Sequence, residues 1–166
     1  MAHPGKQLAM AALLAATQLL PSVTARAARI SVMGDCVAVP DPRCMLEACR
    51  RGQGLTYMTS DGGVTLSIVG AATNASSWRI DVRRESARWP SGVRLWVRRS
   101  GAGMGSGRIR GGETFQEVTP TSTFLCSGSG DRLNVPLQIK VTGLSFQTPV
   151  GTYTAALAYT LITLGE

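Results

Sequence analysis

Residues 149–164 decide the fold class of this chain, and they read Pro-Val-Gly-Thr-Tyr-Thr-Ala-Ala-Leu-Ala-Tyr-Thr-Leu-Ile-Thr-Leu. Pro149 and Gly151 give a turn signal, and no charged residue, glycine or proline follows within the stretch. Large apolar side chains share one parity and threonines take the other: Tyr153, Leu157, Tyr159 and Leu161 against Thr152, Thr154 and Thr160. This alternation predicts a β-strand with one buried face. Because its second face is uncharged, we expect a central strand, paired on both sides.

The rest of the chain shows similar short segments, alternating or β-branched, between turn signals. We expect strands at residues 29–33, 36–39, 55–59, 64–69, 77–84, 93–99, 115–118, 123–126 and 133–141. Only residues 42–51 suggest a short helical turn, since Asp41 can cap it and Gly52 can end it. Many short strands without βαβ alternation predict an all-β fold, an antiparallel immunoglobulin-like β-sandwich of about seven to nine strands.

Several connections are predicted from local signals. Residues 55–59 and 64–69 should form a hairpin across residues 60–63, and residues 77–84 and 93–99 a longer one whose Trp89-Pro90 loop is anchored on the core. The segment 100–112 is rich in glycine and is expected to be the most flexible part. Pro136 cannot donate a ladder hydrogen bond, so its strand should lie at an edge or be bulged there.

The N-terminus predicts export. His3 and Lys6 precede an uncharged, mostly Ala/Leu run at residues 8–20, which is too short to span a bilayer and suits a signal peptide. We expect cleavage after Ala25 or Ala27 and one secreted domain, residues 28–166 in the second case, without a transmembrane segment. Cleavage after Ala27 removes two of the 17 basic residues, leaving 15 against 10 acidic ones and a net charge of +5. The expected location is secreted, periplasmic or at the cell surface.

Four cysteines follow the leader: Cys36, Cys44, Cys49 and Cys126. An even number in an exported chain favours two disulfides, and their spacing lacks the paired C-x2-C knuckles of zinc sites. Three connectivities are possible, and each joins Cys126 to the distant N-terminal cluster.

Arginines alternate outward on two predicted strands, with Arg79 and Arg83 on one and Arg94 and Arg98 on the other. If these strands pair, the arginines form one basic face that also carries Trp96. Such a face could bind an anionic polysaccharide or another polyanion, with the aromatic ring as a stacking platform. The alternative is a solvated outer face, partly balanced by Asp81 and Glu85. The pattern does not indicate a specific nucleic-acid site.

Catalysis is not expected. The only histidine lies in the leader, so Ser-His-Asp and Cys-His chemistry and histidine metal sites are excluded for the secreted part. The carboxylates form no recognisable glycosidase pair. We therefore expect no cofactor, no metal and no enzymatic activity.

The motif Pro149-x-Gly151-x-Tyr153-Thr154 and the strand after it resemble the last strand of bacterial secreted β-sandwich subunits of the spore coat U and fimbrial or pilus types. Gly151 and Tyr153 are also similar to a tyrosine corner of immunoglobulin-like sandwiches. The chain departs from these families in its ending, Leu164-Gly165-Glu166, and in its N-terminal cysteine cluster. The resemblance implies a structural role at the cell surface.

Two functions therefore compete. The first is a non-catalytic surface, pilus-like or coat subunit that self-assembles, or joins other surface subunits, by β-strand addition. We expect the joining edge in the Pro136 strand or the N-terminal strand rather than in the C-terminal strand. The second is a secreted module that binds anionic glycans through the arginine face.

Overall fold

The computed structural model describes residues 28–34, 54–59, 61–71, 77–85, 89–145, 147–148 and 152–164. The predicted signal peptide, the strand at residues 36–39, the helical turn at residues 42–51 and Gly151 lie outside these ranges, as do Cys36, Cys44 and Cys49.

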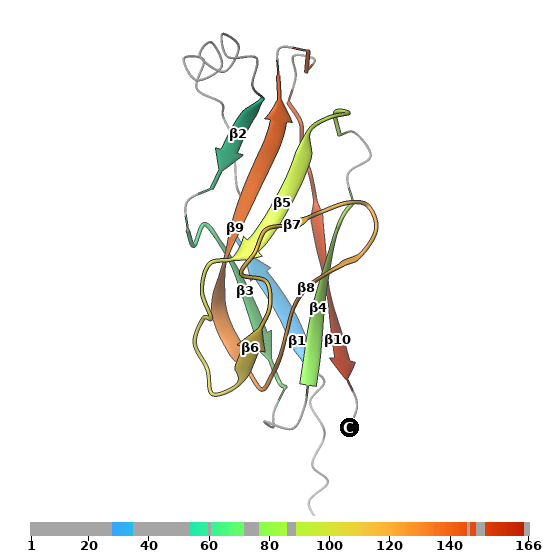
Figure 1. Ribbon diagram of the computed structural model, residues 1–166. Coiled ribbons are helices and arrows are strands. Elements are labelled where there is room, and N and C mark those ends of the chain that lie inside the picture. Colours follow the sequence, from blue (N-terminus) through green and yellow to red (C-terminus); the bar gives the residue numbers. More distant parts are fainter. Residues whose placement is uncertain are drawn as a thin grey trace, which may run out of the picture.

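The described residues form ten strands in two antiparallel sheets, which confirms the predicted all-β class (Figure 1). The first sheet has the order β1-β3-β9-β5-β7, and β2 pairs with β9 on the same side as β3. Its strands are β1 (Arg29–Met33), β2 (Leu55–Met58), β3 (Val64–Val69), β5 (Arg94–Arg99), β7 (Gln116–Glu117) and β9 (Arg132–Leu144). The second sheet has the order β10-β4-β8-β6. Its strands are β4 (Ser77–Arg84), β6 (Arg108–Arg110), β8 (Thr123–Ser129) and β10 (Leu157–Leu164).

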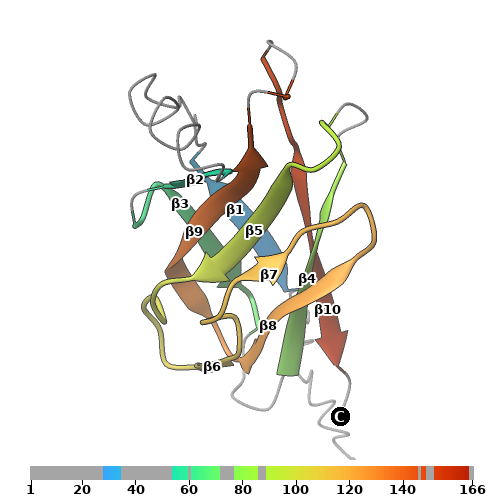
Figure 2. The same cartoon turned by 45° about the horizontal axis from the view of Figure 1, so that its top comes forward.

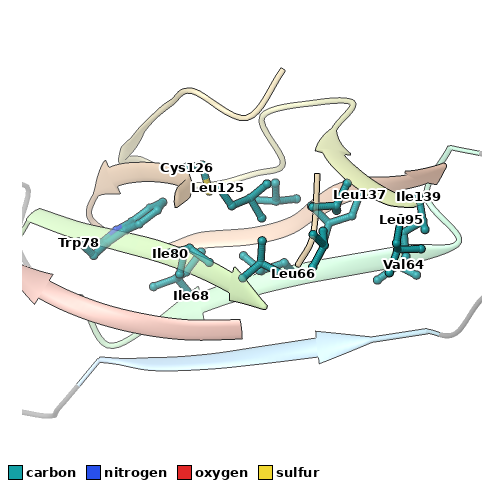
Figure 3. Packing of buried hydrophobic residues seen from close by; sticks show 14 of the residues in the cluster. Val64, Leu66, Ile68, Trp78, Ile80, Leu95, Leu125, Cys126, Leu137 and Ile139 are labelled. Carbon is teal, nitrogen blue, oxygen red and sulfur yellow. The ribbon is translucent and has the colours of Figure 1, made fainter. Parts of the chain in front are cut away.

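The two sheets enclose a core made by alternate residues of their strands, as the period-two patterns predict. Trp78, Ile80 and Val82 of β4 point inward, and they are at most 1% exposed. Leu66 and Ile68 of β3 meet them from the other sheet (Figure 3). Burial of these side chains is the main favourable contribution to the free energy of folding.

Strand β9 is the centre of the first sheet, so the expectation that Pro136 marks an edge strand is wrong. Pro136 lies opposite Thr65 of β3, and on its other side its carbonyl accepts a hydrogen bond from Ser100 N at 3.0 Å. In an antiparallel strand the N–H and C=O of one residue point to the same side. An N–H at position 136 would therefore point toward Ser100, which lies just after the end of β5. The proline thus removes no hydrogen bond to a residue of β5. The expected irregularity lies next to it, where the β3–β9 register shifts between Leu66 and Ile68.

Strands β2 and β3 do not form the predicted hairpin. Both run antiparallel to β9 and follow one another along it, with β2 opposite residues 140–144 and β3 opposite residues 132–137. Thr59 continues the β2 ladder: its N–H bonds Ile139 O at 2.9 Å, and its hydroxyl accepts from Ile139 N at 3.0 Å. The Gly-containing segment after Thr59 therefore joins two strands that lie along the same side of β9, and does not reverse the chain.

The glycine-rich segment 100–112 is packed, contrary to the flexibility expected from its composition. Met104 exchanges two 2.7 Å backbone hydrogen bonds with Leu133, and β6 pairs with β8. A Cβ on Gly107 would lie 1.7 Å from Ser129 O, so glycine is required for this close approach. The buried Arg99 side chain also contacts this segment, because it donates hydrogen bonds to Gly111 O and Gly101 O.

The C-terminal strand β10 has the predicted buried face but not the predicted position. Leu157, Tyr159 and Leu161 are partly buried and pack against the core. However, β10 pairs only with β4, and no other described strand pairs along its outer side. It is therefore an edge strand rather than a central one. The edge strand of the other sheet, β1, lies close to β10 on the same side of the molecule (Figure 3).

Candidate interaction surfaces

The four arginines predicted to form one basic face are divided between two sheets. Arg79 and Arg83 lie on β4, whereas Arg94 and Arg98 lie on β5 of the other sheet. The two strands lie in different layers of the sandwich (Figure 2). Because both direct alternate residues into the common core, their outward residues face opposite sides of the molecule. The predicted hairpin between them is wrong because β4 pairs with β8 and β10, and β5 pairs with β9 and β7.

Three of these arginines have carboxylate partners. Arg79 Nε lies 2.6 Å from Asp81 Oδ1, and the Arg79 guanidinium lies 5.2 Å from the centroid of a phenylalanine ring. Arg83 pairs with Glu85 at 2.8 Å and Arg94 with Glu117 at 3.4 Å. The positive charge of Arg79 and Arg83 is thus largely balanced by the carboxylates of Asp81 and Glu85, each two residues further along the chain, as the solvated-face alternative describes.

The outer face of the first sheet carries a cluster of two aromatic rings and two cations, Trp96, Phe115, Arg98 and Lys140, which we call the aromatic–cation cluster. Lys140 lies directly across from Trp96 in the β5–β9 ladder. Its Nζ is 5.0 Å from the Trp96 ring centroid and 4.2 Å from that of Phe115. Arg98 stacks on Phe115 at 4.7 Å and donates to Gln138 Oε1 at 2.9 Å. Such cation–π contacts hold the cations close to the aromatic surface.

Sequence reasoning identified Trp96 and Arg98 but missed Lys140 and Phe115. Lys140 comes from a strand that is distant in sequence, and only the β5–β9 register brings it opposite Trp96. The sequence did show that Lys140 points outward, because it lies between Ile139 and Val141, which both point into the core.

A cavity of about 390 Å³ lies at one end of the sandwich, and we call it the end pocket. Its polar lining includes Arg84, Arg94 and Glu117, and its apolar lining includes Trp89 and Val118. The Arg84 guanidinium lies 5.1 Å from the Trp89 ring centroid, and Trp89 Nε1 donates to Val93 O at 2.6 Å. Trp89 packs against the core, which confirms the prediction that its loop is anchored there.

The outer edge of β10 is a third candidate surface. The strand is eight residues long, Leu-Ala-Tyr-Thr-Leu-Ile-Thr-Leu, and carries no charge, glycine or proline. Ile162 and Leu164 point away from the core and are 38% and 47% exposed. Long, flat and apolar edges are sites where another chain can add a strand.

Cys126 is a free cysteine in the structure, and the three cysteines predicted as its possible partners lie outside the described residues, so the predicted bridge stays a prediction. Its side chain is 1% exposed and lies in the core beside Trp78 and Ile80 (Figure 3). Burial raises the pKa of the thiol to about 11, and the charge of Arg99 opposes this effect in part. A thiol in this environment is poorly reactive.

Tyr153, the residue predicted to form a tyrosine corner, lies before β10 and is 36% exposed. Its predicted partner in the turn, Gly151, lies outside the described residues.

The described ranges contain no group of three or more His, Cys, Asp or Glu side chains placed to hold a metal ion. They also include no helix with the length and apolar character needed to cross a bilayer.

Comparisons of the chain with protein-family models, with curated proteins and with solved structures found no match.

Proposed function

We propose that this protein is a non-catalytic, exported structural subunit of the cell surface. It has an immunoglobulin-like arrangement and forms a pilus-like, fimbrial or coat assembly by β-strand addition at the outer edge of β10. The observation that carries the proposal is the position of this uncharged eight-residue strand at the edge of its sheet.

Within the described residues, the β10 strand itself carries none of the sequence devices with which monomeric β-proteins block further pairing. These devices are very short edge strands, lysines, prolines and bulges that twist the edge away. The opposite edge of the same sheet, β6, has only three residues, and β7 at the edge of the other sheet has two. Strand β1 has five residues and begins with Arg29. Among the described edge strands, β10 is thus the longest and has no charge.

The occupant that we propose is an extended segment of a second copy of this chain. After cleavage at Ala27 the chain carries 15 basic and 10 acidic residues, a formal net charge of +5, so two copies repel one another over most approaches. The uncharged β10 edge avoids this repulsion locally. Backbone hydrogen bonds along the strand provide affinity, and the outward Ile162 and Leu164 add apolar contact.

Export and a non-catalytic role are supported by the sequence. Residues 1–27 have the charge and hydropathy pattern of a signal peptide, and no histidine follows them. The C-terminal strand resembles that of secreted surface subunits. An oxidising exterior also suits the four cysteines that follow the leader.

The variant Thr160→Lys tests the proposed edge. Thr160 points outward on β10 opposite Asp81, so a lysine there adds an edge charge without entering the core. We expect wild-type protein to form oligomers or fibres by native mass spectrometry and negative-stain microscopy, and the variant to remain monomeric. The matched control is Thr65→Lys, which places the same charge on the outer side of β3, a strand paired on both sides. A monomeric wild-type protein, or a Thr160→Lys variant that assembles like the control, would contradict the proposal.

A second candidate function is binding of anionic glycans by the outer face of the first sheet. The specific observation is the aromatic–cation cluster, which places two cations beside two aromatic rings. Salt-dependent retention on heparin should weaken in the double variant Arg98→Ser/Lys140→Ser. It should not weaken in Arg79→Ser/Arg83→Ser, whose arginines lie on the other sheet and already pair with carboxylates. Equal loss in both double variants would indicate only a non-specific effect of net charge.

A further inference from the structure

Arg84 is a charged residue at a core position. It ends β4 on the same parity as Trp78, Ile80 and Val82, which are all buried. In the β10–β4 ladder it lies opposite Leu157, which itself packs against the core. The Arg84 side chain is therefore directed toward the space between the sheets and reaches the end pocket.

The hydrogen bonding of the Arg84 guanidinium is incomplete. Its Nε is buried and has no hydrogen-bond partner in the described part of the chain. The guanidinium carbon lies over the Trp89 ring, 5.1 Å from its centroid, and this ring contact uses none of the five N–H donors of the group in a conventional hydrogen bond. A buried charged donor without an acceptor lowers stability, and an anion that supplies acceptors would remove this cost.

The charge of the end pocket matches a monovalent anion. Three charged side chains line it: Arg84, Arg94 and Glu117. Glu117 already pairs with Arg94 at 3.4 Å, so one uncompensated positive charge remains, on Arg84. A planar carboxylate fits the guanidinium fork in a bidentate manner and carries the single charge that is required. A dianionic phosphate would leave an unbalanced negative charge near Glu117.

We propose that the end pocket binds the carboxylate of a single acidic sugar residue, a uronic acid. The carboxylate would bond Arg84, and the sugar ring would lie against the partly exposed Trp89 and Pro90. The cavity of about 390 Å³ lies in the lower part of the usual range for small-ligand sites, about 300–1,000 Å³. This inference uses neither the β10 edge nor the aromatic–cation cluster.

Titration of the purified protein with D-glucuronate, followed by two-dimensional ¹H–¹⁵N NMR, tests the proposal without any variant. The Trp89 indole N–H and the Arg84 Nε–H should shift together and saturate. Glucose, which has the ring without the charge, and inorganic phosphate should each bind at least roughly tenfold more weakly, because each lacks one half of the match. Acetate tests the carboxylate alone, and it should shift Arg84 Nε–H while binding more weakly than glucuronate. Unchanged Trp89 and Arg84 signals would overturn the proposal, as would phosphate binding as tightly as glucuronate.

Variants then separate the pocket from general electrostatics. Arg84→Gln should weaken glucuronate binding by roughly tenfold or more, and Arg84→Lys, which keeps the charge but loses the fork, by less. The matched control is Arg83→Gln, which removes the same charge one residue away. Arg83 points to the outer face and pairs with Glu85, so its loss should leave binding unchanged. Equal weakening in Arg83→Gln and Arg84→Gln would refute a specific site.

Discussion

The buried thiol of Cys126 allows a direct measurement of how well the core excludes water. Burial raises its pKa from 9.0 to about 11. In the unfolded chain the thiol has its ordinary pKa, so between pH 9 and 11 the unfolded chain loses a proton that the folded chain retains. The contribution of the buried, protonated thiol to the free energy of unfolding is therefore fully present below pH 9 and is lost as the pH rises through 11. A shift of two pKa units corresponds to about 3 kcal/mol.

The assay is urea unfolding of wild-type protein and of Cys126→Ala at several pH values from 7 to 11. The alanine variant removes the thiol and leaves the other titrating groups in place, so those groups cancel in the difference between the two proteins. The variant should be less stable at pH 7 because it leaves a small cavity in the core. The wild-type advantage should then fall by roughly 2 kcal/mol between pH 7 and pH 11, and the full loss of about 3 kcal/mol is reached only above pH 11.

A difference that stays constant with pH would refute the reasoning. Alkylation supplies a second readout, because iodoacetamide should modify Cys126 in urea but only slowly in the folded protein. If Cys126 resists alkylation in urea until a reductant is added, it is bridged as the sequence predicted, and the pH dependence calculated for a free thiol would not apply. Rapid alkylation of the folded protein would show that the thiol is accessible.

Two further predictions concern packing, and urea unfolding measures both. Trp78→Phe should lower the free energy of unfolding by roughly 2–4 kcal/mol. It leaves a cavity and removes the 2.8 Å hydrogen bond from the indole N–H to Gly130 O. A loss below about 1 kcal/mol would count against a tightly packed site. Gly107→Ala should cost roughly 1–3 kcal/mol, since the new methyl group would lie 1.7 Å from Ser129 O. The same change at Gly54, whose Cβ would approach other atoms only to 3.4 Å, should cost less, and equal losses would contradict the steric explanation.

Sequence reasoning was reliable where the structure depends on side-chain parity. The inward set Trp78, Ile80 and Val82 and the strand bounds of β4 follow directly from alternation, because a strand buries alternate residues whatever its partners are. Pairing does not follow from alternation. β4 and β5 are successive strands, yet each pairs with strands distant in sequence, so the predicted basic face does not exist.

The position of β10 shows a second limit. Side-chain alternation reports the two faces of a sheet, whereas an edge is defined by backbone groups that point sideways within the sheet. An uncharged strand can be central or at an edge with the same sequence pattern. The end pocket, in contrast, had a signal that was missed: Arg84 continues the parity of a buried strand, and a charge at such a position is unusual.

The central place of β9 in the first sheet also constrains the order in which the chain can fold. Residues 132–144 supply the hydrogen-bonding partners of β2, β3 and β5, which all precede β9 in the chain. These three strands therefore cannot pair with β9 until residues 132–144 have been synthesised. Strand β10 follows β9 in the chain and joins the second sheet later still. Contacts between segments so far apart in sequence form slowly. The first sheet should accordingly form only after β9 has been synthesised, rather than strand by strand as the chain grows.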